Sequence, residues 1–321
     1  MSTHVFAAVL TSYGVAANNR GMNEGNTTTL QKLLWNGQVH TTVSAESIRF
    51  ALRRRLAEAG QKCNRSFNES SRMNEWIEPS FAAWNSESGD TFADDDLLGF
   101  MIATGAGTEG GGTDESEEEE SSGKKGKGKA KAKAKGSATV RRAVLEITRA
   151  VSLTPWAGDV TFNAASPGAT PSAQKKGKDN PVPYATEMHA TRYQYGLSLT
   201  PEHLRVRARA AVALQSICAL GEVAGNHGRF LYDFSPESVV FRVTQDPAPR
   251  LLYTFEQRNE QPAISSLVRK VKAGDIQASE LIIGGSIIDG LSQEERKAME
   301  GAALFAGVMA ACQEVCRRLP K

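Results

Sequence analysis

An apolar strand, a polar loop with two glycines and a basic helix follow one another within the first 56 residues, and this succession constrains the fold most. The run from Val5 to Val15 is rich in β-branched residues and alanine, which predicts a buried strand. The loop RGMNEGNTTT follows at 20–29, and its glycines allow the backbone to approach a ligand closely. Since Asn, Thr and Arg contact phosphate and sugar oxygens, the loop indicates a phosphate-bearing partner. A solvated turn is the alternative.

A short apolar segment continues the chain beyond this loop. Residues 29–35 predict a helical turn with three leucines facing inward and Lys32 facing outward. The pair Asn36-Gly37 predicts the turn that ends it.

A basic amphipathic helix comes next. Ser44 is the predicted N-cap, and the buried stripe recurs every four residues at Ile48, Leu52 and Leu56. Arg49 and Arg53, also four apart, share one flank of this helix. Two guanidinium groups beside a polar loop are typical of a phosphate track, and a solvated arginine face is the alternative.

The segment 19–56, with NRGMNEGNTTTLQKLLW and HTTVSAESIRFALRRRL, resembles the DevR-type branch of the backbone subunits of type I CRISPR (Cascade) effector complexes. The resemblance extends more loosely to ATEMHATRYQYGLSLTP at 185–201 and GNHGRFLYDFSPESVVF at 225–241. It implies an α+β fold: a modified RNA-recognition-motif (ferredoxin-like) core with an inserted helical subdomain and a thumb-like loop.

The same resemblance implies a function. Members of this family bind guide RNA (crRNA) in several copies that assemble along it, contact other effector subunits, and present the guide for pairing with target DNA; in type I systems they do not cleave RNA. We therefore expect a cytoplasmic, non-enzymatic subunit in antiviral defence. The residues that we assign to RNA binding are Asn19, Arg20, Asn23, Asn26, Thr27, Thr28, Lys32, Arg49, Arg53, Lys175, Lys176 and Arg229.

Composition divides the chain into four parts. Residues 1–59 are expected to form the first part of the core and 60–106 a helical insertion whose aromatic residues, Phe67, Trp76 and Trp84 among them, belong to a small core rather than to base stacking. Seven acidic residues and then seven lysines follow within 107–137, which predicts a disordered loop. Residues 138–321 complete the core.

Two segments of this last part carry specific expectations. The thumb-like loop is placed at 161–184, because this stretch is rich in Pro, Gly and Ser and has three lysines at its middle; a disordered linker is the alternative. Residues 140–153 fit neither a helical nor an alternating pattern, and the resemblance implies that they return to the central sheet as a strand. A C-terminal helix is expected to open with a capping box at Ser292 and Glu295 and to bury Met299, Ala302, Phe305 and Met309.

Several function classes find no support in the residues. The longest apolar runs fall short of a membrane span, and Val5–Leu10 is too short for a signal peptide. The four cysteines and five histidines have no metal-ligand spacing, and no cofactor fingerprint is present, so neither a metal nor a cofactor is expected. Glu24 is the single acid of the loop, and no histidine or second carboxylate lies near it in sequence to complete the pair that acid–base cleavage of RNA would need. An RNA-processing enzyme and a developmental or transcriptional autoregulator remain the alternatives.

Overall fold

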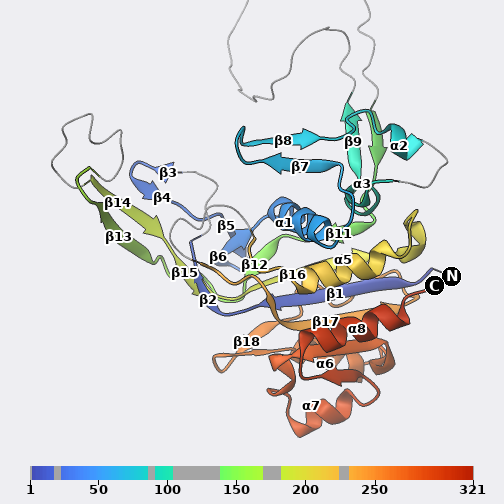
Figure 1. Cartoon of the computed structure of the whole chain (residues 1–321). Helices are drawn as coiled ribbons and strands as arrows, with labels where there is room; N and C mark the ends of the chain where they lie inside the picture. The colour runs from blue at the N-terminus through green and yellow to red at the C-terminus, as the bar shows by residue number, and fades with distance from the viewer. Residues whose placement is uncertain are drawn as a thin grey trace, which may run out of the picture.

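The computed structural model describes residues 2–17, 23–85, 91–103, 138–168, 182–223 and 231–320. Within them a nine-stranded sheet forms the centre of the fold, which is mixed α+β as expected (Figure 1). Its strands in spatial order are β21 (Ala303–Phe305), β20 (Leu281–Gly285), β17 (Pro236–Thr244), β1 (His4–Thr11), β16 (Tyr193–Leu199), β12 (Ala150–Ser152), β6 (Gln38–Val43) and β5 (Lys32–Trp35), and β11 (Leu145–Ile147) also pairs with β16.

The two faces of this sheet are covered differently. Alternate residues of β1 point to opposite faces, so Val5, Ala7 and Val9 join one hydrophobic cluster while Phe6, Ala8 and Leu10 join another. The first cluster is covered by α1 (Ala45–Glu58), α5 (Arg209–Cys218) and α8 (Val308–Arg318). The second is covered by α6 (Ser265–Lys272) and the segment around Met299, in the lobe that also holds α7 (Gln293–Ala298) (Figure 1).

Helix α1 has the predicted start and core. The side chain of Ser44 accepts a hydrogen bond from the backbone N–H of Ser47, and Ile48, Leu52 and Leu56 are buried. The segment before it is not helical, because Asn36 and Gly37 both adopt positive φ, 48° and 78°, and close a two-residue hairpin between β5 and β6. The prediction of a helical turn is therefore wrong, and Leu34, expected inside, is 73% exposed.

The insertion is less helical than expected. Its hairpin of β7 (Arg65–Asn68) and β8 (Met73–Trp76) forms because the Asn68 side chain accepts two backbone N–H groups of its own turn. The rest of its described part is α2 (Ala82–Asn85), α3 (Ala93–Leu98) and β9 (Phe100–Ala103), which pairs with β10 (Ala138–Arg141). The core interpretation fails for Phe67 and Trp76, which are 36% and 40% exposed, whereas Arg205 lies over the ring of Trp84 at 3.9 Å.

Helix α3 carries three consecutive buried carboxylates that tie the insertion to the core. Asp96 accepts hydrogen bonds from the backbone N–H groups of Arg205 and Val206 and from the Arg209 guanidinium at 2.9 Å. Asp94 accepts hydrogen bonds from the backbone N–H groups of Asn64 and Arg65, at 2.7 and 3.0 Å. Burial and the neighbouring Asp94 raise the pKa of Asp95 to about 7.

The C-terminal part differs from the single helix expected. The capping box of Ser292 and Glu295 is confirmed, but α7 ends at Ala298. Gly301, at a φ of 97°, redirects the chain into β21 before α8 begins. The expected return of 140–153 to the sheet is confirmed by β11 and β12, while β10 pairs outside it.

The remaining elements are β2 (Gly14–Ala16), β3 (Asn23–Glu24), β4 (Thr27–Thr28), β13 (Val160–Ala165), β14 (Val182–Glu187), β15 (His189–Thr191), β18 (Glu256–Arg258), β19 (Gln261–Ala263), η1 (Pro201–His203), η2 (Ala278–Glu280) and η3 (Ser286–Ile288). In the part of the chain that the structure describes, no helix has the length and apolarity to cross a membrane. The expected disordered loop at 107–137 lies outside the described residues.

Candidate nucleic-acid interface

The polar loop and the thumb hairpin belong to one small sheet. Strands β13 and β14 form an antiparallel hairpin, β4 pairs in parallel with β14 through Thr27 and Thr28, and β3 completes the order β13-β14-β4-β3. The backbone N–H of Ala185 also donates to the carbonyl of Asn26 at 3.0 Å. This four-stranded unit, the arm, projects from the central sheet (Figure 1). Segments far apart in the sequence therefore form one structural unit here.

The loop end of the arm presents amides and hydroxyls. Asn23 and Asn26 are exposed, and Thr27 and Thr28 are half-buried. The Thr28 hydroxyl donates to Asn23 Oδ1 at 3.1 Å, and Asn26 Nδ2 donates to the Pro183 carbonyl. Gly25 turns the hairpin at a φ of 60°, and a Cβ there would meet nothing within 4 Å. Its role is conformational rather than one of close approach.

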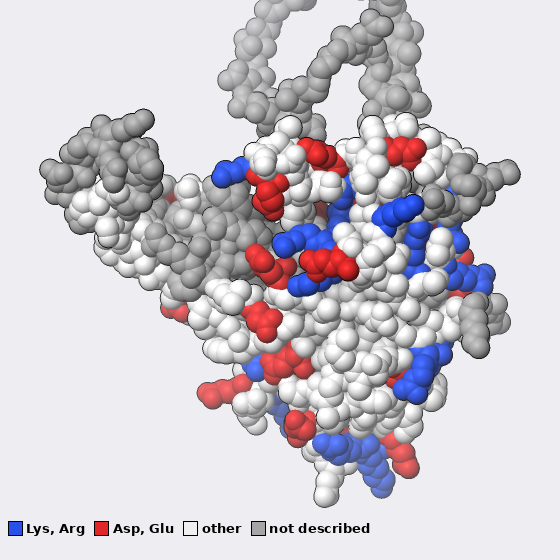
Figure 2. Space-filling view, viewed as in Figure 1, with Lys and Arg blue, Asp and Glu red and all other residues white. Residues whose placement is uncertain are grey.

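Uncharged side chains dominate the described part of the thumb. Strand β13 reads VTFNAA and β14 reads VPYATE, so Glu187 is the one charged residue of the two strands. Figure 2 shows this hairpin mainly as white surface. Its outer face is apolar, with Val160 and Phe162 at 51% and 75% exposure. The described strands of the thumb therefore offer apolar surface rather than cations.

An ion pair with a buried carboxylate and a partly exposed lysine joins the loop to the base of the thumb. Glu187, 8% exposed, accepts the Leu30 N–H at 2.7 Å, and its carboxylate lies 2.6 Å from Lys32 Nζ. The Lys32 ammonium also lies 4.3 Å from the ring centroid of Trp156, whose indole N–H donates to the Met188 carbonyl. Lys32 was expected to face a phosphate, but in this structure it holds a carboxylate. We call this group, Lys32, Glu187 and Trp156, the latch.

A network of hydroxyl groups and a histidine fixes the strand that follows the thumb. The Thr41 hydroxyl lies 2.7 Å from His189 Nδ1 and 2.9 Å from the Tyr193 hydroxyl. Thr11 Oγ1 accepts the Tyr193 N–H and lies 2.8 Å from the Tyr232 hydroxyl. Burial lowers the pKa of His189 to about 4, so the ring is neutral near pH 7. Beside the charged latch, uncharged groups therefore hold the strand that follows the thumb.

The two arginines of α1 that were assigned to RNA contact, Arg49 and Arg53, are directed to different places. Arg53 is 17% exposed, its Nε lies 3.4 Å from Asp94 Oδ2, and burial lowers its pKa. Arg49 lies instead at the wall of a groove on the sheet. The phosphate track expected from their spacing is thus divided, because Asp94, distant in sequence, reaches only one of them.

The remaining predicted residues lie outside the described residues: Asn19, Arg20, Lys175, Lys176 and Arg229. Sequence reasoning missed Glu187, Trp156 and His189. The signal for Glu187 was its position as the single carboxylate of the strand that leaves the thumb. Within the described residues, no group of three His, Cys, Asp or Glu is placed to hold a metal ion.

Comparisons with known proteins agree with one another. A family model described as CRISPR-associated negative auto-regulator DevR/Csa2 matches residues 7–260. The chain is 61% identical to the CRISPR-associated protein Cas7/Cst2/DevR of Myxococcus xanthus (strain DK1622), over 99% of this chain and 98% of that protein.

Solved structures share the fold at low sequence identity. A chain of a CRISPR RNA-guided surveillance complex in a pre-nicking state matches with a TM-score of 0.60 and 10% identity, over 99% of this chain and all of that one. A chain of a second CRISPR RNA-guided surveillance complex matches with a TM-score of 0.56 and 12% identity, over 98% of both chains.

Proposed function

The chain belongs to the DevR/Csa2 family of CRISPR-associated proteins as a Cas7-type subunit, and from this premise we propose that it binds guide RNA as the repeating backbone subunit of a type I effector complex. The observation that carries the proposal is the arm, in which the polar loop and the thumb form one sheet. A strand of RNA lying along this unit contacts both segments at once. The fold that the chain shares with subunits of RNA-guided surveillance complexes supports the same function.

We also propose that the core is a modified RNA-recognition motif. In chain order its elements are β1, α1, β11 with β12, β16, α5 and β17, a βαββαβ succession. In space the strands lie in the order β17, β1, β16, then β11 and β12, and each neighbouring pair is antiparallel. This is the fourth-first-third-second order of the ferredoxin-like plan, with both helices on one face. Hairpin β5–β6 and the insertion are additions to it.

The proposed contact surface recognises sugar and phosphate rather than bases. On the arm it comprises the exposed amides of Asn23 and Asn26 and the half-buried hydroxyls of Thr27 and Thr28. Arg49 stays in the proposed set, but it lies at the groove on the sheet rather than on the arm. Lys32 and Arg53 hold carboxylates, and we assign them to positioning this surface. Asn19, Arg20, Lys175, Lys176 and Arg229 stay in the proposed set on sequence grounds alone. Binding of this kind is independent of base sequence and falls with salt.

Assembly follows from the same surface. Several copies are proposed to bind one guide side by side, each thumb reaching toward the next copy and interrupting base stacking at intervals. Such an array requires head-to-tail contacts that do not close into a ring, because an isologous contact stops at two copies. The guide RNA supplies the driving force by holding neighbouring copies at high effective concentration. Other effector subunits and target DNA, paired to the guide, complete the set of proposed partners.

Light scattering with RNAs of two lengths tests the proposal. The protein alone is expected to be monomeric or loosely associated, and to form particles whose mass rises stepwise with RNA length. Deleting residues 171–179 is expected to weaken assembly on the long RNA more than binding of one copy to the short one. A closed dimer whose mass does not change with RNA length would contradict the backbone function and favour the autoregulator that the family model's description names. Metal-dependent RNA cleavage lost in Glu24→Ala would instead favour an RNA-processing enzyme.

A further inference from the structure

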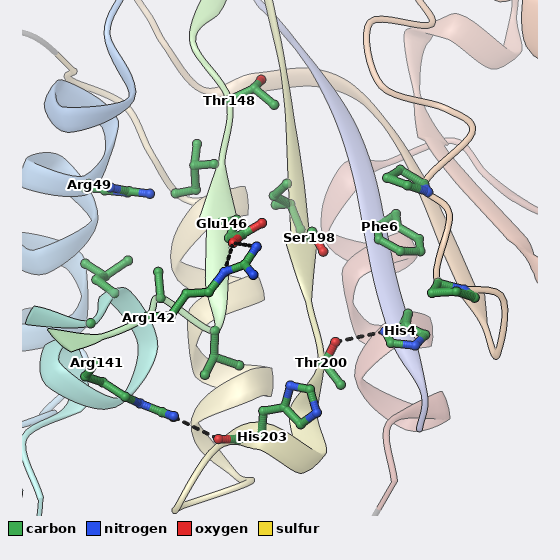
Figure 3. A pocket seen from close by; sticks show the side chains of 18 of the residues that line it. His4, Phe6, Arg49, Arg141, Arg142, Glu146, Thr148, Ser198, Thr200 and His203 are labelled. Atoms are coloured by element: carbon green, nitrogen blue, oxygen red, sulfur yellow. Dashed lines mark hydrogen bonds and ion pairs between the residues drawn. The ribbon is translucent and has the colours of Figure 1, made fainter. Parts of the chain in front are cut away.

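A groove runs over the sheet on the face opposite α5, away from the arm, and α1 contributes Arg49 to its side. It encloses a cavity of about 1200 Å³ (Figure 3). Because side chains alternate along a strand, β1, β16 and β11 bury apolar residues under the helices and turn the others into the groove. Residues that line its floor are His4, Phe6, Glu146, Thr148, Ser198 and Thr200. Most of these floor residues are polar, and the floor lies between two walls.

One wall of the groove is held in place by a buried arginine. Arg242, 2% exposed, donates to Glu280 Oε2 and to the Ala248 carbonyl, both at 2.7 Å, and to Asp246 at 3.1 Å. These bonds fix the loop that contributes Pro247, Pro249 and Leu252 to the wall. Gly196 of β16 lies beneath this wall, since a Cβ there would stand 2.4 Å from a Leu252 methyl group. The wall is thus preorganised.

The opposite wall presents arginines. Arg141 donates to the His203 carbonyl at 2.9 Å. Gly99 packs directly against the Arg141 backbone, because at its φ of 70° a Cβ would lie 2.2 Å from the Arg141 carbonyl oxygen. Arg49 lies on the same side of the groove, farther along it (Figure 3). The Nε atoms of both arginines are buried without a hydrogen-bond partner within the structure described. Buried donors of this kind call for an acceptor.

Charge in the groove has one dominant sign. Arg49, Arg141 and Arg142 line it against one carboxylate, Glu146. Glu146 lies 2.7 Å from the Arg142 guanidinium, whose side chain is 85% exposed. Arg141 also lies 3.7 Å from the buried Asp96 carboxylate, so Arg49 and the exposed Arg142 are the guanidinium groups offered to phosphates along this walled, hydroxyl-bearing floor.

A pair of aromatic side chains, Trp35 and Tyr253, lies outside the residues that line the groove but is joined to two of them through the chain, since Tyr253 follows Leu252 and Arg149 follows Thr148. The rings of Trp35 and Tyr253 lie 5.0 Å apart, each half-buried. Tyr253 adopts a φ of 52°, rare for a non-glycine residue, and its hydroxyl donates to the Arg149 carbonyl at 2.8 Å. Positioned aromatic rings beside arginines are the elements with which proteins stack single-stranded bases.

We propose that this groove is a second binding site for single-stranded nucleic acid, distinct from the arm. Phosphates contact Arg49 and Arg142, and a base stacks on the Trp35–Tyr253 pair. The inference rests on the proposed RNA-binding function and extends it to the sheet face. An acidic protein segment would pair with the arginines, but it carries no base to stack on the Trp35 and Tyr253 rings.

Charge reversal in two matched ion pairs tests the site. Arg142→Glu and Arg317→Glu each place a carboxylate beside an existing one, because Arg142 pairs with Glu146 at 2.7 Å and Arg317 with Glu314 at 2.8 Å, and both side chains are at least 70% exposed. The probe is a short oligouridine containing 4-thiouridine, bound to the full chain. Arg142→Glu is expected to weaken its affinity about tenfold and to lower the salt slope by about 0.7 per lost phosphate contact, and Arg317→Glu to leave both unchanged.

Photo-crosslinking separates this proposal from the general one. Irradiation of wild-type protein with the same oligonucleotide is expected to label peptides containing Trp35 or Tyr253. Crosslinks confined to residues 23–28 and 160–187, with equal affinity in the two variants, would overturn the groove and leave the arm as the RNA site. Loss of association between copies in Arg142→Glu at unchanged oligonucleotide affinity would overturn it in favour of a protein interface. Absence of any binding by wild-type protein would overturn both proposals.

Discussion

Lys32 and Glu187, 155 positions apart in the sequence, form an ion pair 2.6 Å long that joins the loop to the base of the thumb. Glu187 also accepts the Leu30 N–H, so the carboxylate holds the loop through both its backbone and its lysine. A residue that the sequence assigns to RNA contact is thus committed within the protein. Rigid positioning of two binding segments reduces the ordering that RNA must impose on them.

The latch gives the first prediction. Lys32→Met leaves the Glu187 carboxylate without its cation in a nearly buried place, so the free energy of unfolding is expected to fall by roughly 1–3 kcal/mol in urea titrations. The salt slope of RNA binding is expected to stay at its wild-type value, because Lys32 has no phosphate to lose. Lys297→Met, on the exposed side of α7, is the control. A stable Lys32→Met variant with a lower salt slope would return Lys32 to the RNA surface.

The second prediction concerns Asp96. This fully buried carboxylate bonds two backbone N–H groups and the Arg209 guanidinium. Asp96→Ala leaves these donors and a buried cation unpaired, so the free energy of unfolding is expected to fall by about 3–5 kcal/mol. Glu58→Ala, which removes an exposed ion pair with Arg55, is expected to change it little. If Asp96→Ala and Glu58→Ala lowered the free energy of unfolding equally in thermal or urea unfolding, α3 would not anchor the insertion.

The third prediction is a pH dependence with a defined sign. Burial and Asp94 raise the pKa of Asp95 to about 7, so the folded chain binds this proton more tightly than the unfolded one. Asp95 therefore removes stability as the pH rises from about 4 to about 7, by about 1.4 kcal/mol per unit of pKa difference. Asp95→Asn keeps an acceptor for Asn64 and removes the charge. The stability of this variant relative to wild type is expected to increase as the pH rises across this range. A difference that stays constant would contradict the raised pKa of Asp95.

Local patterns allowed part of the fold to be predicted. The cap at Ser44, the stripe of α1 and the capping box at Ser292 depend on residues within one or two turns, and all three are confirmed. The hairpin at Asn36-Gly37 had its signal in the sequence too, since this pair favours a two-residue turn. The leucines before it favoured a helix instead, and pairing with β6 decided between the two.

The candidate site was harder to predict, because its contacts join distant segments. The pairing of β4 with β14, and the carboxylates that hold Lys32 and Arg53, follow from the fold rather than from neighbouring residues. Residue type indicated polar contacts, and only the three-dimensional structure determines which cations are already paired. The groove combines α1, β10, β11 and a loop after β17, which no local motif records.

The last prediction opposes the third in sign. Burial lowers the pKa of His189 to about 4, below the ordinary value near 6.5. The unfolded chain therefore binds this proton more readily, so the stability that neutral His189 permits is present above pH 6.5 and is lost as the pH falls toward 4, by roughly 3 kcal/mol in total. His189→Gln can still hydrogen-bond Thr41 but does not titrate, and its stability relative to wild type is expected to rise over this interval.

The matched variant is His203→Gln, which removes an exposed histidine instead. Urea titrations at closely spaced pH values measure both differences against wild type, so contributions from other groups, Asp95 among them, cancel. His203→Gln is expected to follow the wild-type curve from pH 6.5 to 4. If His189→Gln followed it as well, His189 would be able to accept a proton without disturbing Thr41, and the hydroxyl network could not be what keeps the base of the arm rigid.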